Sequence, residues 1–221
     1  FVLLKSFVNC SLNNSSFDEI STVINDALKL GADSNYGYDY KKDFEDRYVL
    51  RARNPVTTGW ESVDNICKGG LGSGELGVVI APTGAGKSMV LVHLGAQAVK
   101  AGLNVIHYTL ELCHTTIGQR YDSCLTGAQL QDLFSLKEQI YEKVKDIDGN
   151  VIIKEYPTKS ASTNTIRAHL DKLKQQGVPI DMIIVDYGDL LKPVSAPRGS
   201  EKRHDLESIY EELRAIAQIF E

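Results

Sequence analysis

Residues 81–88, which read APTGAGKS, limit the possible folds more than any other part of the chain. They follow an apolar run, 76–81, that predicts a buried strand, and they precede apolar residues at helical spacing that predict a helix over 88–101. A glycine-rich turn between a strand and a helix, ending in Gly-Lys-Ser, is typical of the phosphate-binding loop of nucleoside triphosphatases. The usual motif begins with Gly, where this chain has Ala81, but strand, turn and helix agree with one another.

The residue types in this loop explain how it would bind phosphate. Gly84 and Gly86 let the backbone turn its N–H groups toward a polyphosphate, and the N-terminus of the following helix adds a favourable potential. Lys87 places a positive charge on the β- and γ-phosphates, and the Ser88 hydroxyl can bind Mg²⁺. The expected nucleotide-binding residues are Pro82, Thr83, Gly84, Ala85, Gly86, Lys87, Ser88 and Met89.

Beyond the loop, short apolar strands alternate with helices. Strands are predicted at 104–110, 151–156 and 182–186, and helices over about 116–125, 129–146, 164–176 and from about 205 to the end. Such alternation is typical of a mainly parallel twisted sheet with helices on both faces. The expected fold class is therefore α/β, of the phosphate-loop NTPase type.

Two carboxylates follow strands of this sheet. Asp186 ends a buried run and can hold Mg²⁺ through water, because the carboxyl ends of parallel strands meet beside the phosphate loop. Many NTPases place a catalytic Glu directly after this Asp, but the next residue here is Tyr187. Glu111 closes the strand 104–110 and can orient and deprotonate the attacking water. From the pattern alone, a surface Glu that caps the next helix is an equal alternative.

The N-terminal part of the chain differs from the rest. Residues 17–30 combine a capping-box start with apolar residues at helical spacing, which predicts an amphipathic helix. That helix can pack on its own domain or dock on a neighbouring subunit. Residues 32–54 are polar and tyrosine-rich, which is typical of a linker. We therefore divide the chain into a linker with a docking helix, 1–54, and an NTPase domain, 55–221.

Composition excludes several classes of protein. With 221 residues, of which 43% are hydrophobic, the chain can bury a sizeable core. A net charge of −5 argues against a polybasic protein that coats nucleic acid, but it is compatible with a basic loop on one surface. The four cysteines form neither a CxxC pair nor a Cys–His spacing typical of zinc. No apolar run reaches the roughly 18 residues that span a membrane, so we expect a cytoplasmic protein without membrane contact.

A basic loop is predicted directly after the strand that ends in Asp186. Residues 192–204 combine Pro, Gly and Ser with the positive charges of Lys192, Arg198, Lys202 and Arg203. Such a loop can contact a nucleic-acid backbone, and the binding would then depend on salt. An ordinary solvated loop fits the composition equally well.

Together these features resemble the DnaB-type hexameric replicative helicases among the RecA-like ATPases, and within them the replicative helicases of T4-type phages. The resemblance covers roughly residues 17–221. It rests on 33–40 and 44–48 before the motor domain, 68–76 before the phosphate loop, the strand end 107–112 (HYTLEL), Gln119 and Arg120 on the next helix, 184–187 (IVDY), and 198–203.

This resemblance implies roles for particular residues. Glu111 would be the catalytic base, with Lys87 and Arg120 supporting the active site. Ser88 and Asp186 would hold Mg²⁺, with ATP as the nucleotide. Arg198, Lys202 and Arg203 would contact DNA from a loop that faces a central channel.

The resemblance also implies an assembly and a process. These are a homo-hexameric ring, ATP hydrolysis at the ring interfaces, and translocation on single-stranded DNA during replication in a bacterial or phage-infected cell. The helix over 17–30 would dock on the adjacent subunit. Primase and a helicase loader would bind through regions beyond this chain. A polar sensor and an arginine finger would follow residue 221, so we expect the isolated chain to bind nucleotide weakly and hydrolyse it poorly.

Two other functions stay open on this evidence. One is a different RecA-like ATPase, either a recombinase or a signalling ATPase, which the segment 32–48 and the docking helix disfavour. The other is an interaction module that keeps nucleotide binding for assembly only. The intact set of Lys87, Ser88, Glu111 and Asp186 argues against such a module.

Overall fold

The computed structural model describes residues 37–48, 53–194 and 202–220. The chain divides into two compact units, Phe1–Arg51 and Ala52–Glu221. In the first unit, the 3-10 helix η1 (Glu45–Tyr48) is held by Arg47, whose guanidinium lies 4.0 Å from the centre of the Tyr40 ring and donates to the Tyr40 carbonyl at 2.6 Å. The helix predicted over 17–30 lies outside the described residues.

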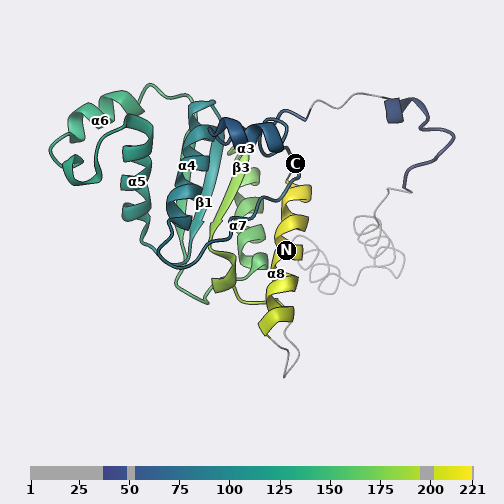
Figure 1. The fold of residues 1–221 in the computed structure, drawn as a ribbon. Coiled ribbons are helices and arrows are strands. Elements are labelled where there is room, and N and C mark those ends of the chain that lie inside the picture. Colours follow the sequence, from purple (N-terminus) through teal and green to yellow (C-terminus); the bar gives the residue numbers. More distant parts are fainter. Residues whose placement is uncertain (1–36, 49–52, 195–201, 221) are drawn as a thin grey trace, which may run out of the picture. The chain divides into compact units, whose positions relative to one another are not determined.

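The second unit is built on a parallel sheet, which in the described part of the chain has three strands in the order β2-β1-β3 (Figure 1). These are β1 (Asn104–Thr109), β2 (Asn150–Glu155) and β3 (Met182–Asp186). The central strand β1 is buried from its second residue to its last, as expected for a strand covered on both faces. The carboxyl ends of the three strands therefore share one edge of the sheet.

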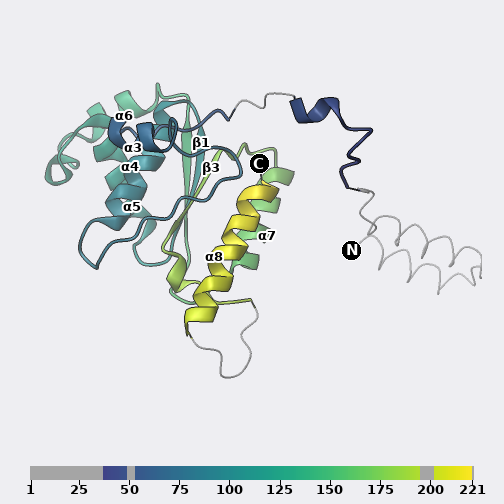
Figure 2. The same ribbon diagram turned by 45° about the vertical axis from the view of Figure 1, so that its right-hand side comes forward.

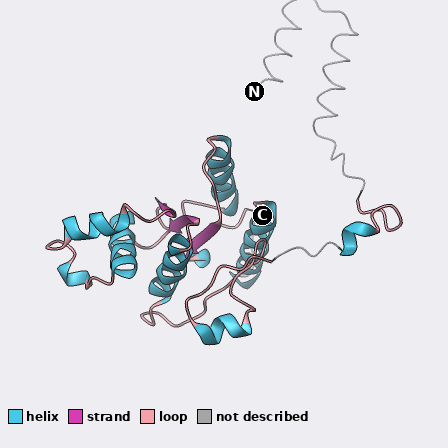
Figure 3. Cartoon of the chain, turned by 90° about the horizontal axis from the view of Figure 1, so that it is seen from above, coloured by secondary structure: helices cyan, strands magenta, loops and turns pink. Residues whose placement is uncertain are grey.

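The sheet lies between two helical layers (Figure 2), and the side chains of β1 pack in separate hydrophobic clusters. Ile106 and Tyr108 pack with α7 (Thr163–Gln175) and α8 (Lys202–Ile219). On the other face lie α4 (Lys87–Lys100) and α5 (His114–Thr126), which pack against the sheet through residues such as Val92 and Ile117. Seen from above, the strands lie between the helices (Figure 3). The predicted α/β architecture is confirmed.

Within the described ranges, no helix is both long and apolar enough to cross a membrane.

Four shorter elements complete the described part of this unit. They are α3 (Glu61–Ile66), η2 (Leu130–Asp132), α6 (Lys137–Val144) and η3 (Gly188–Leu190). The continuous helix predicted over 129–146 is wrong, because it divides into η2 and α6. The Asp132 carbonyl accepts from the Ser135 hydroxyl at 2.8 Å and from the Ser135 and Leu136 N–H groups at 3.1 Å each. This local turn competes with continuation of the helix.

The strand predicted over 76–81 is also wrong, because these residues have no regular secondary structure. Leu76, Val78 and Ile80 are 38%, 50% and 90% exposed. An apolar, β-branched run forms a strand only where neighbouring strands supply hydrogen bonds and side-chain contacts. In the described part of the chain, β1 pairs with β2 and β3, and residues 76–81 pair with none of these strands.

The basic loop predicted over 192–204 is shorter than expected, because α8 begins at Lys202. Lys and Arg are good helix formers, and neither Gly nor Pro follows Gly199 in this region. Lys202 and Arg203 therefore belong to the first turn of α8 rather than to the loop.

His107 makes the stability of this fold depend on pH. The ring is fully buried on β1, its Nδ1 lies 2.9 Å from the Tyr121 hydroxyl, and its Nε2 has no partner in the described part of the chain. Burial lowers the pKa of His107 to about 4. The unfolded chain, with a histidine pKa near ~6.5, binds the proton first, so stability is complete above that pH and is lost as the pH falls toward the folded pKa.

We therefore expect the free energy of unfolding to drop by about 2 kcal/mol between pH 7.5 and pH 5 because of this one group. Urea denaturation at the two pH values measures the drop, and His107→Gln should reduce it by that amount. His204 is an exposed control, with 68% of its side chain accessible, so His204→Gln should leave the pH dependence intact. An equal drop in wild type and His107→Gln would contradict this assignment.

Candidate functional site

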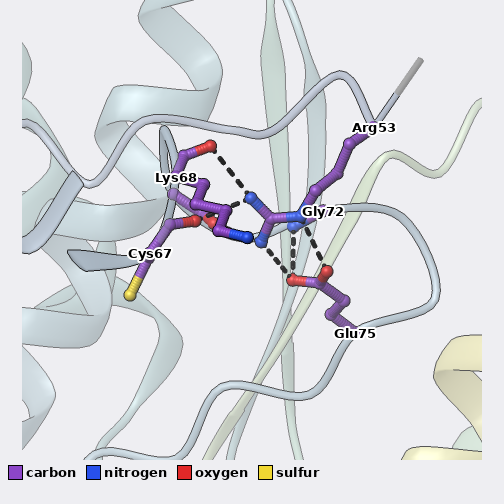
Figure 4. A network of polar contacts seen from close by, with 6 residues as sticks. Arg53, Cys67, Lys68, Gly72 and Glu75 are labelled. Carbon is purple, nitrogen blue, oxygen red and sulfur yellow. Dashed lines mark hydrogen bonds and ion pairs between the residues drawn. The ribbon is translucent and has the colours of Figure 1, made fainter. Parts of the chain in front are cut away.

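Arg53 holds the loop that leads to the phosphate-binding segment (Figure 4). Its guanidinium donates to both oxygens of Glu75, at 2.8 and 2.5 Å, and to three backbone carbonyls between 2.6 and 3.0 Å away. Glu75 also accepts from the Gly72 N–H at 3.0 Å. These hydrogen bonds lower the pKa of Glu75 to about 2. The three carbonyls are those of Cys67, Lys68 and Gly70.

The phosphate-binding loop has the backbone that its glycines predict. Gly84 and Gly86 have φ values of +80° and +93°, and a Cβ at either position would meet no neighbouring atom. The left-handed conformation, rather than crowding, therefore requires glycine at these two positions. Gly86 is the N-cap of α4, which begins at Lys87. The Lys87 ammonium folds back onto the loop and donates to the carbonyls of Ala81 at 2.9 Å and Pro82 at 3.3 Å.

A fully buried carboxyl group, that of Asp186, lies at the carboxyl end of β3. The pKa of Asp186 is raised, mainly by burial and in smaller part by the negative charge of Glu111. A hydrogen bond from Ser88 and the positive charges of Arg120 and Lys87 partly oppose this rise. Ser88 thus approaches the carboxyl group, although neither carboxylate oxygen makes a hydrogen bond of good geometry to a described residue. The structure brings together these five side chains, which come from α4, α5, β3 and the turn after β1.

The unpartnered carboxylate of Asp186 fits a magnesium ion. A buried carboxylate without a donor is costly unless a cation or donor compensates it. Mg²⁺ takes one or two protein oxygens and completes its shell with water and phosphate oxygens. Asp186 and Ser88 supply a carboxylate and a hydroxyl of this kind. Among the residues that the structure describes, no group of three His, Cys, Asp or Glu side chains could hold a metal ion, so a site built from protein side chains alone is not found there.

Glu111 lies in the turn between β1 and α5 and is exposed. Hydrogen bonds fix the turn on both sides of this residue. The Leu110 N–H donates to the Asp186 carbonyl at 2.8 Å, and the Thr109 hydroxyl donates to the Leu112 carbonyl at 2.7 Å. The side chain of Glu111 is thus presented at the sheet edge that also carries Asp186, as the strand order predicts.

The other predicted site residues are distributed over three places. Pro82, Thr83, Gly84 and Ala85 form the exposed surface of the phosphate loop, and Met89 is 41% exposed in the first turn of α4. Arg203 is exposed in the first turn of α8. Arg198 lies outside the described residues, and for Lys202 the structure describes the backbone alone.

Sequence reasoning missed Arg53 and Thr109. Arg53 falls in a segment that reads as a polar linker, and Thr109 reads as an ordinary strand residue. No periodicity or motif distinguishes either one, because their roles depend on hydrogen bonds that only the folded chain brings together.

A family model and a sequence relative agree on one family. Residues 55–221 match the DnaB-like helicase C-terminal domain. The DnaB-like replicative helicase of Enterobacteria phage T4 is 32% identical over an alignment of 212 residues, and the match covers 90% of this chain and 44% of that protein. This chain therefore spans less than half the length of the phage T4 relative.

Two solved structures share the fold. A DnaB-like replicative helicase, described with its interactions with primase, has a TM-score of 0.63 at 14% identity and covers 99% of this chain and 54% of its own. The second, an ATPase domain, has a TM-score of 0.61 at 16% identity, covering 92% of this chain and 67% of its own. At such identities these two likenesses show the fold alone. On the match over residues 55–221, the chain belongs to the family of DnaB-like helicase C-terminal domains.

Proposed function

We propose that this chain is the motor domain of an ATP-driven replicative DNA helicase. In this proposal, ATP hydrolysis at the interfaces of a homo-hexameric ring drives translocation along single-stranded DNA. The observation that carries it is the cluster around buried Asp186. There one carboxyl group has its pKa shifted by four neighbouring side chains, those of Ser88, Lys87, Glu111 and Arg120. Family membership supports the assignment of this cluster to ATP hydrolysis.

Each side chain of the cluster has a place in the reaction. Lys87 leaves its contacts with the loop carbonyls and binds the β- and γ-phosphates, which the loop N–H groups also hold. Ser88 and Asp186 would hold Mg²⁺, which would supply positive charge beside the phosphates. Glu111 orients a water molecule and accepts its proton as the water oxygen bonds to the γ-phosphorus and ADP leaves. Arg120 contributes positive charge beside these groups.

We assign DNA binding to the basic stretch 192–204, which follows β3 and ends in the first turn of α8. Arg198, Lys202 and Arg203 follow the strand that ends in Asp186, so they lie close in sequence to the nucleotide site. In the proposed ring, the helix predicted over 17–30 docks on the adjacent subunit. Primase and a helicase loader bind through regions beyond this chain, inside a bacterial or phage-infected cell.

The DNA assignment predicts a change in salt dependence. In the full-length protein, the double substitution Arg198→Ala and Arg203→Ala should weaken binding of single-stranded oligonucleotides and reduce the slope of log affinity against log salt by about one to two units. Fluorescence anisotropy at several salt concentrations measures the slope. Arg214 is a matched control because it is exposed on α8, the helix that also carries Arg203. Arg214→Ala should therefore keep the wild-type slope. An unchanged slope in the double variant would remove these residues from the DNA interface.

Strand separation tests the proposed function as a whole. The full-length protein should unwind a forked DNA duplex with ATP and Mg²⁺, and should fail to do so with a non-hydrolysable ATP analogue. Filament growth along DNA without strand separation would instead indicate a recombinase. Hydrolysis with neither activity would indicate an ATPase that serves signalling or assembly.

A further inference from the structure

The segment that follows β2 contacts two other connections of the sheet, the turn after β1 and the chain after β3. On one side it contacts the turn that holds Glu111, and on the other side it contacts the chain that leads to the basic stretch 192–204. The Tyr156 N–H donates to the Thr109 carbonyl at 2.9 Å, which continues the strand pairing past the end of β2. The next residues, 157–162, run along the same edge of the sheet.

Thr158 fixes the peptide that precedes Glu111. Its hydroxyl donates to the Leu110 carbonyl at 2.9 Å, and that carbonyl belongs to the peptide bond between Leu110 and Glu111. The Leu110 N–H donates in turn to the Asp186 carbonyl at 2.8 Å. Both backbone polar groups of Leu110 are therefore held, one by β3 and one by Thr158. Since a peptide is planar, holding this carbonyl sets the orientation from which the Glu111 backbone departs.

A second contact holds the far end of the same turn. Glu155, the last residue of β2, accepts from the His114 N–H at 3.0 Å and lies 2.9 Å from the His114 Nδ1. The turn that carries Glu111 is thus held on both sides, at His114 by the last residue of β2 and at Leu110 by Thr158 in the segment that follows β2.

The segment 157–162 is equally tied to the chain after β3. The Lys159 N–H donates to the Leu190 carbonyl at 3.1 Å, and the Lys192 N–H donates to the Ala161 carbonyl at 2.8 Å. Ser162 and Lys192 form a parallel bridge. Adjacent residues, Thr158 and Lys159, therefore contact the Glu111 turn and η3 respectively.

Helix α8, whose first turn belongs to the basic stretch, is hydrogen-bonded to the same segments. On α8, the Tyr210 hydroxyl donates to Asp189 in η3 at 2.8 Å, and Glu212 accepts from the Thr163 hydroxyl at the start of α7. A shift of the chain between β3 and α8 would therefore reach residues 158–162 through backbone hydrogen bonds, and Glu111 through the Thr158 hydroxyl.

We propose that Thr158 is a positioning residue for Glu111, and that it links the basic stretch 192–204 to the rate of ATP hydrolysis. The inference rests on the proposed function, because it takes Glu111 as the base and single-stranded DNA as the ligand of the basic stretch. A catalytic group displaced by about 1 Å can lose roughly 100-fold in rate, so one hydrogen bond next to Glu111 can control turnover.

Three variants of the full-length protein test this role. Thr158→Val keeps the shape of the side chain and removes the donor, whereas Thr158→Ser keeps the hydroxyl. Ser160→Ala is the matched control, because the Ser160 hydroxyl donates at 2.6 Å to the Pro157 carbonyl within the same segment and reaches neither neighbouring connection. Circular dichroism and urea denaturation establish that each variant is folded. The kcat and KM for ATP are then measured with and without a saturating single-stranded oligonucleotide.

We expect Thr158→Val to lower the DNA-stimulated kcat by about tenfold or more, with KM within about twofold of wild type. The ratio of stimulated to basal kcat should fall toward one. Thr158→Ser should restore both values, and Ser160→Ala should match wild type. A wild-type ratio in folded Thr158→Val, whether or not the two rates fall together, would overturn the proposed link. Absence of DNA stimulation in the wild-type protein would instead refute the proposed function on which the inference depends.

Discussion

Replacing Lys87 with alanine in the full-length protein should reduce ATP turnover by at least about 100-fold and weaken nucleotide binding. Lys87 begins α4, and its ammonium already lies at the phosphate loop, where it donates to the Ala81 and Pro82 carbonyls. Triphosphate oxygens are stronger partners for an ammonium than neutral carbonyls. The substitution removes this charge and leaves the backbone N–H groups of the loop in place.

Titration with a fluorescent ATP analogue measures the binding, and phosphate release measures the turnover. Lys100 is a suitable control because it lies at the opposite end of α4, where its ammonium donates to the Cys124 carbonyl at 3.2 Å. Lys100→Ala should bind and hydrolyse ATP like wild type. Near-normal binding and turnover in Lys87→Ala would mean that residues 81–88 are not the nucleotide site.

Glu111→Gln, unlike Lys87→Ala, should lower catalysis while it leaves ATP binding largely intact. We expect kcat to fall by about 10²–10⁴-fold, because the amide cannot accept the proton of the attacking water. ATP affinity should change little, since the contribution of a base belongs to the transition state. The amide is nearly the same size as the carboxyl group and can still occupy the turn between β1 and α5.

The same two assays separate these effects. Glu138, which is exposed on α6, provides the matched control, so Glu138→Gln should leave both kcat and affinity unchanged. If Glu111→Gln lost affinity and kcat in parallel, the side chain would serve binding rather than proton transfer. If kcat stayed within about threefold of wild type, the base would have to be another residue.

Much of the fold follows from local pattern. The boundaries predicted for the last strand, residues 182–186, are those of β3, and the helix after the phosphate loop begins within one residue of its predicted start. A continuous apolar run predicts a strand because a strand buried on both faces admits few polar residues. Glycines predict turns and helix ends because few other residues adopt the left-handed backbone.

The failures of prediction have a common cause. The run 76–81 has the composition of a strand, but a strand also requires a partner, and the pattern within one segment cannot supply it. The pattern over 129–146 likewise continues past Asp132, where hydrogen bonds from Ser135 and Leu136 end the short helix. Both outcomes depend on interactions that periodicity does not describe.

The candidate site divides in the same way. The rule that parallel strands end at one edge correctly places Glu111 and Asp186 together, and the phosphate-loop motif places Lys87 and Ser88 beside them. Arg53 and Thr158 could not be found from the sequence, because their partners lie 22 and 48 residues away and single polar residues carry no periodic signal. The supporting contacts of the site are therefore known only from the structure.

The central claim is that hydrolysis at the Asp186 cluster is coupled to single-stranded DNA. The most direct test is steady-state ATP hydrolysis by the full-length protein with and without single-stranded DNA, measured beside the Glu111→Gln variant. We predict strong stimulation in the wild-type protein and its loss in the variant. Hydrolysis that is indifferent to DNA would contradict a nucleic-acid motor, and the basic stretch 192–204 would then be an ordinary surface segment.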